Sequence, residues 1–216
     1  MDLLIEQRSG WVRLTLNRPE ARNALNTALL AHIAQTLGSL AHTDSCRAVV
    51  LTGAEGNFAA GADIAEIEHK TSAQAVTDPR RDHWAAIRAF PKPLIAAVEG
   101  YALGGGFELA LMADLMVLGS TAQLGLPETS LGLIPGAGGG QRLLSLAGRM
   151  RATRLVLTGE IIDAATAYEW GIASHVADGP AFPTAAALAD RIAQRAPLAP
   201  SMTPRRSRTM PRIQRS

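Results

Sequence analysis

The stretch Pro93-Leu94-Ile95-Ala96-Ala97-Val98, followed by Gly100-Tyr101-Ala102-Leu103-Gly104-Gly105-Gly106, decides the fold. Five consecutive apolar residues after a proline predict a buried strand at 94–98. The glycines then turn the chain into a helix that continues to Leu111 and carries Glu108 in its first turn. A buried strand that passes through a glycine-rich turn into a helix is typical of an α/β protein.

The flanking sequence continues this alternation of strands and helices. Alternating side chains predict a hairpin of strands at 3–7 and 11–16, and apolar runs predict buried strands at 48–52 and 114–118. Leucine and isoleucine at three- to four-residue spacing predict a helix from Asn26 through Leu40. Asp163 is expected to cap the helix that follows it. Further helices are expected at 62–69, 80–90, 138–146, 150–157, 164–170 and 184–196.

The net charge is unevenly distributed along the 216 residues. The chain has 21 lysines and arginines against 19 acidic residues, and 47% of it is hydrophobic, which is enough for a sizeable core. Residues 197–216 hold five arginines and no acid, so residues 1–196 carry the remaining 16 basic residues. We therefore expect a slightly acidic core at 1–196 and a disordered basic tail at 197–216. The tail lacks interleaved aromatic residues, so no nucleic-acid partner is expected.

Cysteine and histidine usage argues against disulfides and metal sites. Cys46 is the only cysteine, and the five histidines show no pair with the spacing of metal ligands. The N-terminus lacks the basic start and apolar centre of a signal peptide, and no run is apolar enough to span a bilayer. We expect a cytoplasmic protein without a membrane anchor, a metal or a separate cofactor.

Three loops rich in glycine and alanine each precede a helix, at 58–63, 104–106 and 135–140. Such loops expose backbone N–H groups to a ligand. The glycine-and-lysine phosphate loop, the dinucleotide fingerprint and the serine-hydrolase elbow are all absent from the sequence. The remaining interpretation is an oxyanion hole, in which backbone donors face a polarised carbonyl.

Two carboxylates lie beside these loops. Glu108 directly follows the glycine triplet, and Glu128 follows Pro127 on a separate segment. The two side chains could face each other across a pocket as an acid/base pair. Each position is also typical of an ordinary helix start, where a glutamate is favoured by the helix dipole. The residues alone leave both interpretations open.

Several separated motifs, in order, resemble the crotonase, or enoyl-CoA hydratase/isomerase, family. They are Leu16-Asn17-Arg18-Pro19 with Asn23-Ala24-Leu25-Asn26, the segment 58–63, the stretch 93–106 quoted above, and Ile134-Pro135-Gly136-Ala137-Gly138-Gly139. The segments 17–23 and 125–128 further resemble the hydratases of bacterial phenylacetate breakdown. The resemblance covers about residues 3–197.

The resemblance implies a spiral of β-β-α units, a CoA thioester substrate, and a homotrimer or a dimer of trimers. The family's catalytic glutamates correspond to Glu108 and Glu128, and its oxyanion hole to the N–H groups of Ala62 and Gly105. Gly136 matches a position at the start of a helix whose dipole supports the site. The residues that match CoA-binding positions are Ala21, Arg22, Ala60, Ala62, Asp63, Ile64, Ala65, Gly105 and Gly136.

The implied reaction is the addition of water to a 2-enoyl-CoA. A Δ3,Δ2-enoyl-CoA isomerase is the main alternative, and it typically works with one glutamate; an inactive, truncated subunit is the other. Ala65 stands where many relatives have a lysine or arginine near the CoA phosphates, and Arg22 could replace that charge. Relatives continue for about forty residues as helices, so we expect a truncated helical region and a shift of reading frame near Leu198.

Overall fold

The computed structural model describes residues 1–68 and 78–195. The basic tail expected at 197–216, the end of the helix expected at 62–69 and the frame shift expected near Leu198 lie outside the described residues. In the part that the structure covers, no helix combines the length and hydropathy needed to cross a bilayer.

The described strands form two sheets. The larger has the order β1-β2-β3-β4-β6-β9 and the smaller the order β5-β7-β8. The strands are β1 (Leu3–Gln7), β2 (Trp11–Leu16), β3 (Ala48–Gly53), β4 (Leu94–Val98), β5 (Tyr101–Leu103), β6 (Leu115–Leu118), β7 (Gln123–Gly125), β8 (Ile161–Asp163) and β9 (His175–Val176).

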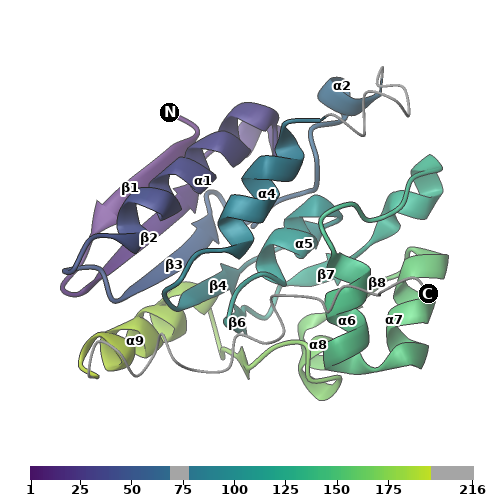
Figure 1. Cartoon of the computed structure of the whole chain (residues 1–216). Helices are drawn as coiled ribbons and strands as arrows, with labels where there is room; N and C mark the ends of the chain where they lie inside the picture. The colour runs from purple at the N-terminus through teal and green to yellow at the C-terminus, as the bar shows by residue number, and fades with distance from the viewer. Residues whose placement is uncertain (69–77, 196–216) are drawn as a thin grey trace, which may run out of the picture.

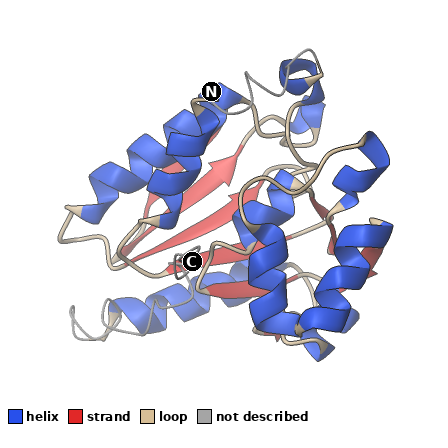
Figure 2. Cartoon of the chain, turned by 45° about the vertical axis from the view of Figure 1, so that its right-hand side comes forward, coloured by secondary structure: helices blue, strands red, loops and turns tan. Residues whose placement is uncertain are grey.

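The helices cover both faces of the larger sheet and gather beside the smaller one (Figures 1 and 2). They are α1 (Thr27–Ala41), α2 (Ile64–Ile67), α4 (Arg80–Arg88), α5 (Gly105–Ala110), α6 (Gly139–Ala147), α7 (Arg149–Thr158), α8 (Ala164–Glu169) and α9 (Ala181–Ala193), with 3-10 helices η1 (Pro19–Ala21) and η2 (Pro127–Leu131). Figure 1 shows α1 and α4 side by side over the sheet and α9 beneath it.

The predicted hairpin and the predicted central strands are confirmed. β1 and β2 pair antiparallel, with Leu3 opposite Leu16, and every other neighbouring pair of the larger sheet is parallel. Parallel strands that are buried on both faces are apolar at consecutive positions. This accounts for the uninterrupted apolar runs at 48–51 and 94–98.

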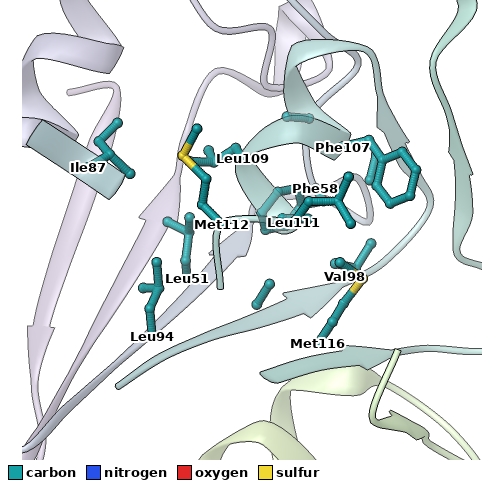
Figure 3. Packing of buried hydrophobic residues seen from close by; sticks show 14 of the residues in the cluster. Leu51, Phe58, Ile87, Leu94, Val98, Phe107, Leu109, Leu111, Met112 and Met116 are labelled. Atoms are coloured by element: carbon teal, nitrogen blue, oxygen red, sulfur yellow. The ribbon is translucent and has the colours of Figure 1, made fainter. Parts of the chain in front are cut away.

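The side chains of β3 and β4 alternate between two hydrophobic cores. Val49 and Leu51 point to the face covered by α1, α4 and α5, whereas Val50 points to the face covered by α9. Figure 3 shows the first core, in which Leu51 and Leu94 from the sheet lie beneath Leu109 and Met112 from the α5 segment. The core therefore fixes α5 on the sheet.

The chain moves from the larger sheet to the smaller one in a repeated way. β4 belongs to the larger sheet and β5 to the smaller, and α5 follows; β6 and β7 repeat this step before η2. After β3, Ala59 forms a parallel bridge to Ala102 of β5, so this segment takes the place of the second strand. The expected spiral of β-β-α units is confirmed.

Some expected boundaries were wrong. The segment 100–106 was expected to be a turn, but it contains β5, and the short strands β7, β8 and β9 were not predicted either. Strands of two or three residues carry too little alternation to be recognised. The helix expected at 184–196 is α9 at 181–193, because Pro183 is tolerated in a first turn, where its missing N–H has no intrahelical partner.

Candidate active site

A cavity of about 500 Å³ opens between the start of α1, α4, α5, η2 and the loop before α6. Five residues predicted from the sequence line it, and they come from four separate segments. They are Ala62, Gly105, Glu108, Glu128 and Gly136. The structure therefore brings both predicted glutamates and both predicted N–H donors to one cavity.

Glu108 lies in the first turn of α5, as predicted, and its side chain is buried, with 3% of the residue exposed. Its Oε1 accepts hydrogen bonds from the backbone N–H of Ala137 at 2.8 Å and of Gly139 at 2.7 Å. Burial raises the pKa of this carboxyl, and the N–H donors with the nearby Arg142 act in the opposite direction. Two backbone donors thus fix Oε1 of this buried carboxyl.

Gly136 does not open a helix, which corrects the sequence prediction. It lines the cavity, but α6 begins three residues later, at Gly139. The strongest backbone donors to Glu108 belong to Ala137 and Gly139, and Gly136 contributes least. The helix expected at 138–146 begins within one residue of the observed start, so only the helix position that the resemblance gave to Gly136 was wrong.

Glu128 lies in η2, directly after Pro127, and faces the same cavity. Burial, with a smaller contribution from the charge of Glu108, raises its pKa to about 7. In the described part of the chain its Oε2 is buried and has no hydrogen-bond partner. An unpartnered buried carboxylate is costly, so the protonated form is favoured up to neutral pH.

Gly104 leaves room for Glu128. A Cβ atom at this position would lie 3.2 Å from Oε1 of Glu128, and the backbone φ of 50° is one that side chains other than glycine rarely adopt. Gly106 has a different reason: a Cβ there would overlap the carbonyl oxygen of Ala59. The glycine triplet thus combines space for a carboxyl with close packing of α5 on the neighbouring segment.

The N–H groups of Ala62 and Gly105 remain for a ligand. The N–H groups of Ala60 and Asp63 bond to Arg22 and Leu25, but none of the described residues accepts from Ala62. Gly105 is the first residue of α5, where an N–H has no intrahelical acceptor. A Cβ atom on Gly105 would lie 3.6 Å from the nitrogen of Ala62, so the two donors border the same space.

The motif at 16–19 with 23–26 supports the loop that carries Ala62, through Arg18 and Asn23. The side-chain amide of Asn23 donates to the carbonyls of Ala54 at 2.9 Å and Asn57 at 2.7 Å, and its oxygen accepts from the N–H of Arg18. Arg18 also forms an ion pair with Asp63, at 3.0 Å between Nη2 and Oδ2. The motif therefore holds the segment that presents Ala62.

Six predicted CoA-binding residues do not line the cavity, but they are close in sequence to residues that do. The N–H of Ala60 donates to the carbonyl of Arg22 at 3.0 Å, so these two segments are adjacent. The Arg22 guanidinium lies 5.9 Å from the centre of the Tyr101 ring. The other four are Ala21 at the end of η1, Asp63 paired with Arg18, and the exposed Ile64 and Ala65 of α2.

Most of the remaining residues that line the cavity were not predicted from the sequence. These lining residues are Leu25, Leu30, Asp78, Arg80, Arg81, Trp84, Leu133, Ile134 and Ala137. The leucines belong to an ordinary apolar stripe, and nothing in the sequence separates a residue that lines a cavity from one that fills a core. Asp78 is buried and binds the guanidinium of Arg80, with 2.6 Å between Oδ2 and Nη2.

Comparisons with known proteins agree with this geometry. A 2,3-dehydroadipyl-CoA hydratase of Escherichia coli (strain K12) is 46% identical over 204 residues, or 92% of this chain and 78% of the relative. A probable enoyl-CoA hydratase of Rhizobium meliloti (strain 1021) is 42% identical over 174 residues, or 81% of this chain and 68% of the relative.

A crystal structure of an enoyl-CoA hydratase from Bacillus anthracis superposes with a TM-score of 0.87 at 36% identity, covering 93% of this chain and 80% of that one. The family model described as enoyl-CoA hydratase/isomerase matches residues 6–206. The resemblance drawn from the separated motifs is confirmed, and the chain belongs to the enoyl-CoA hydratase/isomerase family.

Proposed function

We propose that this chain is an enoyl-CoA hydratase, which adds water across the 2,3 double bond of a 2-enoyl-CoA thioester to give a 3-hydroxyacyl-CoA. The observation that carries the proposal is the pair of glutamates, Glu108 and Glu128, on one cavity with two backbone N–H groups. Hydration needs a group that takes a proton from water and a group that gives one to carbon 2. Two carboxyls that share about one proton meet both needs without a metal.

The surroundings of the two carboxyls assign their roles. Glu108 accepts two backbone hydrogen bonds on Oε1, which stabilise its charged form, so Glu108 is the base that takes a proton from water. Glu128 has a pKa of about 7 and an unpartnered oxygen, so Glu128 is the acid that protonates carbon 2. The charge of each group disfavours ionisation of the other, which keeps one proton on the pair.

The N–H groups of Ala62 and Gly105 are the proposed oxyanion hole. Addition of water at carbon 3 transfers negative charge to the thioester oxygen, giving an enolate-like transition state. Two fixed donors stabilise this oxygen more strongly than the uncharged carbonyl of the substrate, and each such donor contributes roughly 10²–10³ in rate. Both donors line the cavity that also holds the two glutamates.

The CoA moiety is proposed to lie along the adjacent segments of Arg22, Ala60 and α2. Arg22 is exposed beside Ala60, which leaves its positive charge accessible to a phosphate in place of the charge missing at Ala65. CoA is part of the substrate in this scheme, and no separate cofactor is required.

The acyl group is proposed to lie against Leu25, Leu30 and Trp84, which form an apolar wall of the cavity. The most similar relative named above is a 2,3-dehydroadipyl-CoA hydratase, so a short acyl chain is a candidate substrate. The second glutamate favours a hydratase over the isomerase, and an inactive subunit is the remaining alternative.

A homotrimer, or a dimer of trimers, is the proposed assembly. Exposed apolar side chains lie on η2 and the loop after it, α6, α7, β8 and α8, which cluster beside the smaller sheet (Figure 1). They are Leu131, Leu133, Ile134, Leu144, Leu146, Met150, Leu157, Ile161 and Tyr168. Surfaces of this kind mark protein interfaces. Light scattering after size-exclusion chromatography tests the proposal, and a monomer at micromolar concentration contradicts it.

The hydratase proposal is tested by incubating the purified chain with crotonyl-CoA. Loss of the absorbance of the conjugated thioester, with 3-hydroxybutyryl-CoA identified by mass spectrometry, is the expected result. The Glu128→Gln variant is the control for background hydration. A 3-enoyl-CoA converted to its 2-enoyl isomer, with no hydration, would instead identify an isomerase, and no turnover of either substrate would identify an inactive subunit.

A further inference from the structure

A second cavity, of about 480 Å³, adjoins the active-site cavity. Arg81, Trp84, Gly136 and Ala137 line both cavities. Ala137 is the residue whose N–H binds Glu108, so the second cavity begins directly behind the reacting carboxyl. Trp84 therefore lies at the border between the two cavities.

The second cavity differs from the first in its charge. Its lining includes three arginines, Arg81, Arg88 and Arg142, and one acid, Asp82. Arg142 donates to the carbonyl of Ala137 at 2.9 Å and so belongs to the support of Glu108. A half-enclosed space with excess positive charge favours an anion over an alkyl chain.

Arg88 is the cation of this cavity that is available to a ligand. It lies in the last turn of α4, one turn after Trp84, and is half-buried. Among the described residues it has no hydrogen-bond or ion-pair partner, unlike Arg80, which is bound by Asp78. A half-buried guanidinium without a counterion is well suited to a carboxylate, which it binds through two parallel N–H donors.

We propose that the second cavity receives the distal carboxylate of a dicarboxylic 2-enoyl-CoA, and that Arg88 binds this carboxylate. The inference rests on the proposed hydratase function, because it assumes that carbon 3 lies at the glutamate pair. In a six-carbon dicarboxylic acyl chain the distal carboxyl carbon is three bonds, of about 1.5 Å each, beyond carbon 3. The second cavity reaches Glu108 through Ala137, so a chain that extends beyond carbon 3 can continue into it. A methyl-terminated chain of the same length would place an apolar end beside the guanidinium.

The test uses two saturated thioesters, adipoyl-CoA and hexanoyl-CoA, which bind without reacting and differ only at the distal end. Titration calorimetry of the full chain is expected to show adipoyl-CoA binding at least about tenfold more tightly, as for a hydrogen bond between charged groups. Arg88→Met keeps the apolar stem of the side chain and is expected to bring the two affinities within about threefold of each other. Arg88→Lys keeps the charge without the paired donors. Its preference for adipoyl-CoA is expected to lie between that of the wild type and that of Arg88→Met.

Arg149→Met is the matched control, because Arg149 is an exposed arginine at the start of α7, outside both cavities. It is expected to keep the preference for adipoyl-CoA. Equal affinities of the wild-type chain for the two thioesters, or an unchanged preference in Arg88→Met, would overturn the proposal.

Failure of this inference is distinguishable from failure of the proposed function. A chain that hydrates hex-2-enoyl-CoA but binds the two saturated thioesters equally retains the hydratase function and lacks the carboxylate site. A chain that prefers adipoyl-CoA but hydrates no enoyl-CoA retains the site and lacks the activity. Binding of neither thioester refutes both.

Discussion

The backbone N–H of Gly139 donates a 2.7 Å hydrogen bond to Oε1 of Glu108, although 31 residues separate the two. The first residue of α6 is thereby joined to the buried carboxyl of α5. The same glycine has no space for a side chain, since a Cβ atom would lie 2.8 Å from Cγ of Glu108. The position of the carboxyl thus depends on a glycine that is not itself a reacting group.

Replacement of Gly139 by alanine is expected to displace Glu108 and to lower hydratase turnover by about 10²-fold, because small errors in the position of a reacting group have effects of this size. Gly140→Ala is the matched control: its Cβ would lie 3.7 Å from Cγ2 of Val156, an ordinary contact. Within a helix that change stabilises by roughly 0.5–1 kcal/mol. Steady-state kinetics and thermal unfolding of both variants check this, and equal activities would contradict the role of Gly139.

Glu108→Gln and Glu128→Gln are each expected to lower kcat by about 10²–10⁴-fold while the fold is kept. Glutamine has the shape of glutamate but neither takes a proton from water nor delivers one to carbon. Kinetics with crotonyl-CoA and circular dichroism measure the two effects. Activity within a few-fold of the wild type in either variant would show that its glutamate has no role in proton transfer.

Turnover is expected to depend on the proton held by Glu128. Because burial and the charge of Glu108 raise its pKa to about 7, the acid form is lost as the pH rises through 7, and kcat/KM for hydration is expected to fall above that pH. A pH profile of kcat/KM between 5 and 9 is the measurement. A rate that stays constant from pH 6 to 9 would remove Glu128 as the acid.

The same shift affects stability, in a direction that follows from linkage. The folded pKa of Glu128 lies above the ordinary value of 4.5, so the folded state holds a proton that the unfolded state loses between pH 4.5 and about 7. The contribution of Glu128 to the free energy of unfolding is fully present below pH 4.5 and decreases as the pH rises from 4.5 to about 7. Glu128→Gln cannot ionise, so its melting temperature relative to the wild type is expected to rise from pH 4.5 to 7. A constant difference across this range would contradict the raised pKa.

Much of the fold could be predicted from the sequence, and the family resemblance indicated the candidate glutamate pair. β3, β4 and α1 are long enough to show their hydrophobic pattern. Glu108 and Glu128 stand beside glycine and proline, which mark turns and helix starts in a sequence. β9 has only two residues and no such pattern. The role of Ala137 and Gly139 as donors to Glu108 depends on a tertiary contact between α5 and the loop before α6, which local sequence does not encode.

Asn23 is expected to be the polar side chain on which the loop carrying Ala62 depends. It is fully buried, and removal of its side chain breaks its hydrogen bonds to the carbonyls of Ala54 and Asn57 and to the N–H of Arg18; the carbonyl of Ala54 keeps only a 3.4 Å bond from the N–H of Asn57. Asn23→Ala is therefore expected to lower the free energy of unfolding by about 1–3 kcal/mol or more, since each unsatisfied buried group has a cost of that order. Denaturant unfolding measures it.

Comparison of Asn23→Gly with Asn23→Ala separates the effect of the lost hydrogen bonds on stability from the effect of the backbone conformation. Asn23 has a φ of 58°, which glycine adopts without strain and alanine does not. Both variants lose the same three hydrogen bonds, so alanine is expected to be less stable than glycine by roughly 1–2 kcal/mol. Equal stability of the two would show that the left-handed conformation is not maintained once the amide is gone. The side-chain amide would then be needed to fix the turn, since the backbone bond from the N–H of Asn23 to the carbonyl of Arg18 would not hold it alone.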